Sequence, residues 1–75
     1  MITHIVGHVR ARGQDIRRKR EQMGYGLRRF ASQVAISPAH LSRIERGQRG
    51  AQPEVIKRIA DKLQVTMLDI ADPLE

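Results

Sequence analysis

Apolar side chains recur along the chain at intervals of three and four residues, the spacing that places them on one face of a helix. The clearest stripe predicts a helix over residues 27–34 and consists of Leu27, Phe30, Ala31 and Val34. Another helix is expected to begin at Pro53, with an apolar face of Val55, Ile56, Ile59, Ala60 and Leu63. Weaker patterns predict a first helix over about Gln14–Met23 and a short last helix over about Thr66–Ala71.

The segment between the two clear stripes carries the most complete helix signals of the chain. Ser37 can cap a helix that begins at Pro38, because the N–H that proline lacks is not needed at the first helical position. Gly47 can adopt the left-handed conformation that ends a helix. We therefore expect a helix over about 38–46 and, with the others, an all-α fold of five short helices.

The first dozen residues show no clear period. Ile5, Val6 and Val9 are compatible with a backward extension of the first helix, with a strand or with an unfolded arm. We expect residues 1–12 to form an N-terminal arm, flexible or ordered by a partner, and residues 13–75 to form one domain.

Composition narrows the function classes. Seventy-five residues without cysteine make one small domain that has neither disulfides nor thiolate metal sites. One Phe, one Tyr and no Trp argue against single-stranded nucleic acid, whose bases usually stack on aromatic rings. No apolar run is long enough to span a membrane and the first residues lack the features of a signal peptide, so we expect a cytoplasmic protein.

Charge is unevenly distributed along the sequence. Residues 1–50 carry 11 Lys or Arg and 3 Asp or Glu, whereas residues 51–75 carry 3 and 5. A net charge of +8 therefore precedes a segment of −2, within a total of +6. This asymmetry favours a surface that faces a polyanion over one that merely keeps the protein in solution.

Residues 27–46 combine two expected helices with a turn of three residues between them. Ala31 is small where the helices must approach each other closely. A buried seam would fix their crossing angle: Phe30, Val34, Ile36, Leu41 and Ile44. The opposite face of the second helix is narrow and carries cations, as a helix that enters the major groove of DNA requires: Pro38, Ala39, Ser42, Arg43 and Arg46.

In these residues the chain resembles the Cro/phage-repressor helix-turn-helix family, also called the xenobiotic-response-element family. The similarity extends over about Gly13–Ile70 and includes residues 41–47 (Leu-Ser-Arg-Ile-Glu-Arg-Gly) and residues 59–63 (Ile-Ala-Asp-Lys-Leu) with Val65. It implies a compact five-helix, lambda-repressor-like domain that binds double-stranded DNA and regulates transcription.

Several positions depart from the family pattern. Gly26 and Leu27 replace a capping Ser or Thr and a Gln that contacts phosphate. Ala35 stands where the turn usually has Gly, which costs about 1–2 kcal/mol if the residue is left-handed. Arg12 and Lys19 occupy positions that are usually apolar, so we expect thin packing around the first helix.

The outward face of the expected recognition helix supplies candidates for reading bases. A guanidinium can bind guanine O6 and N7 with two hydrogen bonds, worth about 1–3 kcal/mol of discrimination, so Arg43 is the first candidate. The alternative for Arg43 is a phosphate contact. Pro38 and Ala39 could contact a thymine methyl group; the alternative for both is helix initiation alone, which is the favoured interpretation for Pro38. Ser42 could bond a base edge or act as a small spacer.

Other polar residues near this face are candidates for phosphate contacts, with a solvated position as the alternative for each. They are Arg28, Arg29, His40, Arg46, Gln48 and Arg49.

Glu45 is an acid on a face that otherwise favours cations, which indicates a structural role. In the family this Glu pairs with an Arg of the first helix, and the matching residue is Arg20. The resemblance therefore implies a partly buried, bidentate Arg20–Glu45 ion pair. The alternative is that Arg20 is one more solvated charge or phosphate contact of the basic run 17–20.

No motif supports catalysis, a cofactor or a small-molecule ligand, since the sequence has no phosphate-binding loop, serine elbow or carboxylate pair. His4 and His8 stand four residues apart without a nearby third ligand, so we expect no metal site.

We therefore predict a sequence-specific regulator that binds duplex DNA, such as a phage-type repressor or an antitoxin-like autoregulator. A single unit contacts few bases, so a homodimer on a pseudo-palindromic site is expected, joined through the arm or the last two helices. The alternative is that the same fold serves as a protein-interaction adaptor or an RNA-binding module.

Overall fold

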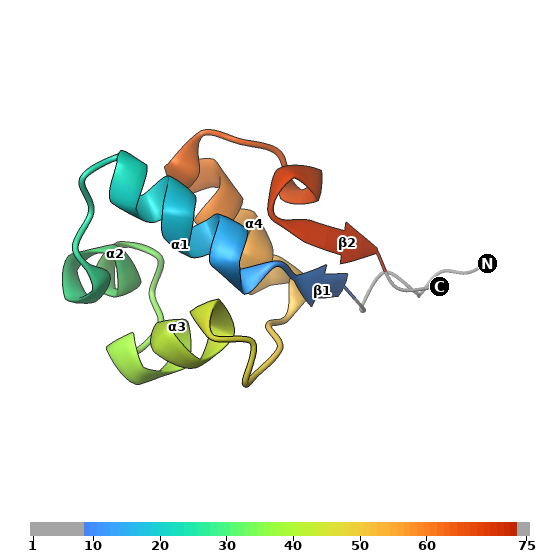
Figure 1. Ribbon diagram of the computed structural model, residues 1–75, viewed down its shortest axis with the longest axis horizontal. Helices are drawn as coiled ribbons and strands as arrows, with labels where there is room; N and C mark the ends of the chain where they lie inside the picture. Colours follow the sequence, from blue (N-terminus) through green and yellow to red (C-terminus); the bar gives the residue numbers. More distant parts are fainter. Residues whose placement is uncertain (1–8, 74–75) are drawn as a thin grey trace.

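The computed structural model describes residues 9–73, which form four α-helices, a 3-10 helix and a two-stranded sheet (Figure 1). In chain order the elements are β1 (Val9–Ala11), α1 (Gly13–Gln22), α2 (Leu27–Gln33), α3 (Pro38–Glu45), α4 (Pro53–Leu63), the 3-10 helix η2 (Met67–Asp69) and β2 (Ala71–Pro73). The four α-helices begin and end within about a residue of the expected bounds. Most of the expected arm, including His4 and His8, lies outside the described residues.

The core is almost wholly aliphatic, as the composition requires. Helix α4 contributes the largest share of it, α2 and α3 each bury an apolar face, and α1 contributes Ile16. Figure 1 shows how these helices are arranged. The buried apolar residues are Ile16, Phe30, Ala31, Val34, Leu41, Ile44, Val55, Ile56, Ile59, Ala60, Leu63, Ile70 and Ala71. The ring of Phe30 lies 5.4 Å from that of Tyr25, centroid to centroid, which closes the core beneath the α1–α2 connection.

Side-chain and backbone chemistry define both ends of α3. The hydroxyl oxygen of Ser37 accepts a 3.0 Å hydrogen bond from the backbone N–H of His40, so the predicted N-cap is confirmed. Gly47 has φ of 75°, the left-handed conformation expected after the last helical residue. Ala35, in the turn before α3, is left-handed as well, with φ of 63°.

The expected fifth helix is wrong in both length and kind. Only one 3-10 turn forms, begun by a capping box in which Thr66 and Asp69 bond each other's backbone and side chain. Ile70 ends this turn, and Ala71 leaves the helical path because its backbone joins β2. Residues 9–73 therefore contain four α-helices rather than five.

The sheet corrects two expectations, that residues 9–11 belong to an arm and that the fold is all-α. Strand β1 runs antiparallel to β2, with Val9 opposite Pro73, Arg10 opposite Asp72 and Ala11 opposite Ala71. Val9 and Ala11 pack against the core from the same face of the strand. This burial and the pairing with β2 keep residues 9–11 in a strand, although their own sequence shows no periodic pattern.

The register of the sheet determines which backbone groups remain free. The N–H of Arg12 donates to the carbonyl of Ile70 at 2.7 Å, just beyond the strands and in the same register. Hydrogen-bonded pairs alternate in an antiparallel ladder, so Arg10 and Asp72 form the next bonded pair. The N–H groups of the two flanking β1 residues therefore point to its free edge. Pro73, in an unbonded pair, loses no ladder bond.

Arg12 joins three elements through one guanidinium. Its Nε donates to Asp15 of α1 at 2.8 Å, one Nη bonds Asp72 of β2, and the other donates to the Leu68 carbonyl of η2 at 2.7 Å. The hydrogen bonds from Arg12 and then Arg18 lower the pKa of Asp15. Arg12, which departs from the apolar preference of the family, thus fastens the sheet to the helices.

Two features are absent from the part of the chain that the structure describes. Its helices are too short and too polar to cross a bilayer. No three side chains of His, Cys, Asp or Glu lie together there as metal ligands would.

Candidate nucleic-acid interface

Helix α3 turns its apolar side inward and its polar side to solvent. Leu41 and Ile44 are 0% and 1% exposed, because both side chains lie in the hydrophobic core. On the opposite face Ala39 and Arg43 are exposed, whereas Pro38 and Ser42 are half-buried. The four predicted base-reading residues therefore share one accessible face of a single short helix.

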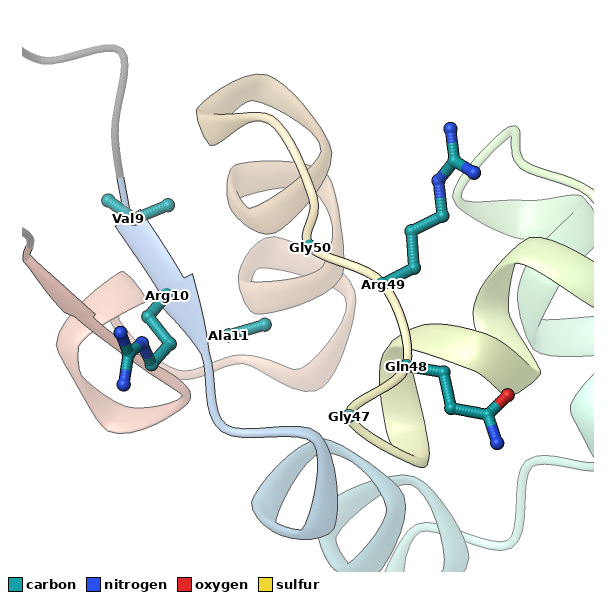
Figure 2. Close-up of a pocket in the computed structure, with 7 residues that line it drawn as sticks. All are labelled: Val9, Arg10, Ala11, Gly47, Gln48, Arg49 and Gly50. Atoms are coloured by element: carbon teal, nitrogen blue, oxygen red, sulfur yellow. The ribbon is translucent and has the colours of Figure 1, made fainter.

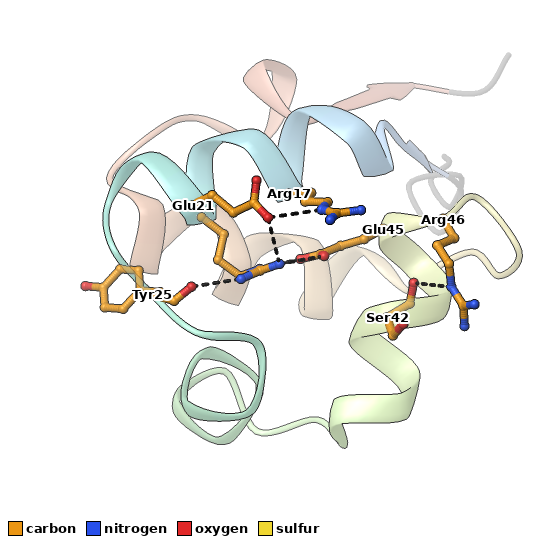
Figure 3. Close-up of polar contacts among 7 residues, drawn as sticks. Arg17, Glu21, Tyr25, Ser42, Glu45 and Arg46 are labelled. Atoms are coloured by element: carbon orange, nitrogen blue, oxygen red, sulfur yellow. Dashed lines mark hydrogen bonds and ion pairs between the residues drawn. The ribbon is translucent and has the colours of Figure 1, made fainter.

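The predicted phosphate contacts lie on α2, on α3 and in the loop after α3. Arg28 and Arg29 are exposed at the start of α2, and Arg46, Gln48 and Arg49 are exposed in the segment that follows α3. His40 is half-buried, and its backbone N–H is used by the Ser37 cap. Helices α2 and α3 pack against each other along the lower part of the molecule in Figure 1. The guanidinium of Arg46 makes one long hydrogen bond, 3.4 Å, to the Ser42 carbonyl (Figure 3).

A buried ion pair links this helix to α1. Arg20 Nε and Nη2 donate to the two carboxylate oxygens of Glu45 at 2.7 and 3.0 Å, and Nη1 donates to the Tyr25 carbonyl at 2.8 Å. The two side chains are 8% and 4% exposed. The structure thus contains the bidentate pair that the resemblance implied, and the bond to Glu45 raises the pKa of Arg20. The pair fixes the C-terminal end of α3 and therefore the direction of its outward face.

Exposed ion-pair contacts on α1 surround the buried Arg20–Glu45 pair. Arg17 Nε donates to Glu21 at 3.1 Å, and Glu21 also lies 4.0 Å from the guanidinium of Arg20 (Figure 3). These outer contacts are solvent-exposed and contribute little to stability compared with the buried pair.

Gly13 is a structural residue that the sequence reading missed. A Cβ on Gly13 would lie 2.2 Å from the Ile44 carbonyl oxygen and 2.5 Å from that of Glu45. The start of α1 therefore packs directly on the backbone at the end of α3. No local signal marks this requirement, because a glycine at a helix start has no pattern and the contact spans about thirty residues.

The eleven arginines divide into two groups according to their partners. Five lie within 4.0 Å of a carboxylate: Arg12, Arg17, Arg18, Arg20 and Arg58. Six have no carboxylate partner among residues 9–73: Arg10, Arg28, Arg29, Arg43, Arg46 and Arg49. Five of these six lie on α2, on α3 or in the loop after it. Their charge is not neutralised locally, so this surface can bind an anion without first breaking an ion pair.

A family model described as helix-turn-helix matches residues 16–70. The chain belongs to this family, the Cro (XRE) type of helix-turn-helix protein. The matched segment extends from Ile16, the first core residue of α1, to Ile70, which directly follows the 3-10 helix η2. It includes the α2–α3 unit and both partners of the buried ion pair.

Solved structures of helix-turn-helix proteins share the fold. ClgR, the clp gene regulator of Corynebacterium glutamicum, matches with a TM-score of 0.74 and 30% identity over 80% of this chain and 64% of that one. SinR in complex with DNA, described as the master regulator for biofilm formation, matches with 0.71 and 26% over 75% and 90%. The restriction-modification controller C.AhdI of Aeromonas hydrophila has the same fold, with 0.72 and 24% over 76% and 86%. The chain thus spans just under two thirds of that ClgR chain. No curated protein matches the sequence.

Proposed function

We propose that this helix-turn-helix protein is a sequence-specific transcription regulator that binds duplex DNA with α3 in the major groove. The observation that carries the proposal is the division of the arginines. Among residues 9–73, five of the six arginines without a carboxylate partner lie on α2, on α3 or in the following loop, whereas those of α1 and α4 are paired. A helix with an apolar inner face and an unneutralised outer face suits a groove lined by phosphates.

The comparisons support the same function. ClgR and SinR are both named as regulators, and SinR has been solved with DNA. The α2–α3 unit and the buried pair that orients it lie within the matched segment.

Within this proposal the residues of α3 have different roles in binding DNA. Arg43 reads a base, because it is exposed in the middle of the helix and has no partner of its own. Ala39 and Pro38 offer apolar contact to a thymine methyl group, and Ser42 can bond a base edge. The surrounding side chains position the helix by contacts to phosphate. They are Arg28, Arg29, His40, Arg46, Gln48 and Arg49.

A single α3 of eight residues reaches few base pairs. Useful discrimination therefore requires two copies, and we propose a homodimer on a pseudo-palindromic site whose half-sites lie about one helical turn apart. Such a protein would act as a repressor or as an autoregulator.

Selection of bound sites from a random duplex library tests the proposal. We expect an enriched site with two related halves. Arg43→Ala should relax the preference at one base pair of each half, by about 1–3 kcal/mol of discrimination. Arg49→Ala should weaken all sequences alike and flatten the salt dependence of binding. Lys57→Ala is a control, because this exposed lysine of α4 is paired with Asp61.

Absence of any enriched duplex, together with binding that does not respond to salt, would exclude a DNA-binding regulator. Preferential binding of a structured RNA in the same assay would point to the RNA-binding alternative instead.

A further inference from the structure

Beside the α2–α3 unit, the structure has a hollow between β1 and the loop 47–50 (Figure 2). Its volume is about 510 Å³. One wall follows directly from the C-terminal end of α3, and the other is the free edge of β1. The hollow therefore borders the loop after α3, which carries two of the proposed phosphate contacts, Gln48 and Arg49.

The charge around the hollow has one sign. Arg10 and Arg49 are its only charged lining residues, both are exposed, and neither has a carboxylate partner among residues 9–73. Within the described part of the chain, Arg10 is also the one arginine outside α2, α3 and the loop that has no carboxylate partner. An anionic occupant would thus meet two cations and would displace no ion pair of either arginine among the described residues.

Both walls expose backbone. The backbone of Arg10 pairs with that of Asp72 in the antiparallel ladder. Because bonded and unbonded pairs alternate, the N–H groups of Val9 and Ala11 point to the free edge of β1, beside the hollow. On the loop side, a Cβ built on Gly47 or Gly50 would meet no atom within 4 Å. Gly50 does not have a positive φ, so no backbone conformation demands glycine there. What the glycine provides is open space for close approach to the main chain.

We propose that this hollow is an accessory site for the DNA backbone, which extends the interface from the recognition helix to β1. The inference rests on the proposed function and names a contact beyond it. Arg10 and Arg49 hold phosphates at the two rims, and free N–H groups of β1 lie between them.

The directions of the side chains favour an extended polyanion over a small ion. In Figure 2 the guanidinium of Arg49 points away from β1, and that of Arg10 leaves the strand on the side opposite the loop. Two groups that diverge in this way are placed to contact different phosphates of one strand rather than one phosphate between them. The backbone of a DNA strand presents its phosphates in such a series.

The test measures the salt dependence of binding to a duplex that the wild-type protein selects. Arg10→Gln removes one proposed phosphate contact, so the slope of log K against log salt should become shallower by about 0.9. Between 50 and 200 mM salt the wild type would then lose about 3.5-fold more affinity than the variant. Arg18→Gln is the matched control: it removes the same charge from α1, where Arg18 is exposed and bonded to Asp15.

Gly50→Val tests the open space independently of charge. Gly50 lines the hollow, a Cβ there would meet no atom within 4 Å, and its φ is not positive, so we expect weaker DNA binding at all salt concentrations and an unchanged Tm. The proposal is overturned if Arg10→Gln behaves like Arg18→Gln and Gly50→Val binds DNA as the wild type does. That result would leave the proposed function intact, whereas a wild-type protein that binds no duplex would end both.

A polyglutamate peptide in the same binding assay distinguishes DNA from the remaining candidate occupant, an acidic protein segment. If Arg10→Gln and Gly50→Val abolish peptide binding and leave DNA binding unchanged, the hollow is a protein-binding site and the proposal is wrong.

Discussion

Where α1 meets α3, a guanidinium and a carboxylate are buried together and satisfy each other. Arg20 uses three of its nitrogens, two on Glu45 and one on the Tyr25 carbonyl. A buried pair of this kind need not stabilise the fold more than apolar residues would. Its geometry is directional, however, and it sets the end of the helix whose other face carries Arg43. We therefore interpret the pair mainly as a positioning device.

Removal of either partner should be costly. Arg20→Ala leaves a buried carboxylate without its donor, and Glu45→Ala leaves a buried guanidinium, so each should lower the free energy of unfolding by about 3–5 kcal/mol. Arg20→Lys should recover only part of this, because an ammonium cannot bind both carboxylate oxygens in the same plane. Urea unfolding at neutral pH measures the difference. Equal midpoints for wild type and Arg20→Ala would show that the pair has no structural role.

Gly13→Ala should destabilise the protein although it adds only one methyl group. The new carbon would overlap the carbonyl oxygens of Ile44 and Glu45, so α1 and α3 must separate, at an expected cost of about 1–3 kcal/mol. Gly50→Ala, which meets no atom, should stay within about 0.5 kcal/mol of the wild type. Thermal unfolding of both variants compares the two glycines directly.

These two contacts also show what sequence can predict at this scale. Arg20 and Glu45 are distinctive residue types in a recognisable order, so the resemblance implied their pairing. The importance of Gly13 comes from carbonyl groups about thirty residues away, and nothing in its neighbourhood indicates them.

At the scale of elements, the helices follow from local signals and the sheet does not. The three- and four-residue spacing locates α2 and α4, and Ser37 with Gly47 locates α3. Strand β2 consists of Ala, Asp and Pro, types that are depleted in strands, and it pairs with residues about sixty positions earlier. A three-residue strand of this composition forms only because its partner and the core below it are already in place. Local propensity therefore predicts neither strand.

The turn between α2 and α3 stores a small strain that can be released. Ala35 is held at φ of 63°, where a β-carbon crowds the following carbonyl. Ala35→Gly should therefore stabilise the protein by up to about 1 kcal/mol, the gain being reduced by the greater freedom of glycine in the unfolded chain. A change of that size raises the Tm of so small a domain by about 4–8 °C.

The expected gain in Tm depends on the left-handed conformation of residue 35 and does not follow from introducing a glycine as such. Ser32→Gly, at an exposed position within α2, should lower the Tm because glycine is a poor helix former. If both substitutions lower the Tm, the left-handed turn does not strain the protein.

At the scale of the whole molecule, acidification should weaken the connection between the sheet and the helices. Hydrogen bonds from Arg12 and then Arg18 lower the pKa of Asp15, and bonds from the backbone and then the hydroxyl of Thr66 lower that of Asp69. The unfolded chain therefore takes up protons at these carboxylates before the folded chain does. Their contribution to stability is complete above the ordinary Asp pKa of 3.8 and is lost as the pH falls below it.

Thermal unfolding between pH 7 and pH 2 measures this loss. The Tm should fall as the pH drops below about 4. Asp15→Asn and Asp69→Asn should each be less stable than the wild type at pH 7 and should lose less on acidification. A parallel acid limb in the wild type and both variants would assign the loss to other carboxylates.

The pairing of β1 with β2 also brings the two boundaries of the described region together. Val9 and Pro73 stand opposite each other in the ladder, at the end of the molecule remote from α2 (Figure 1). A fusion partner joined at either boundary would thus depart from the same corner. A short linker between these residues should permit circular permutation, with the new termini opened in an exposed inter-helix turn such as the one at Gly24.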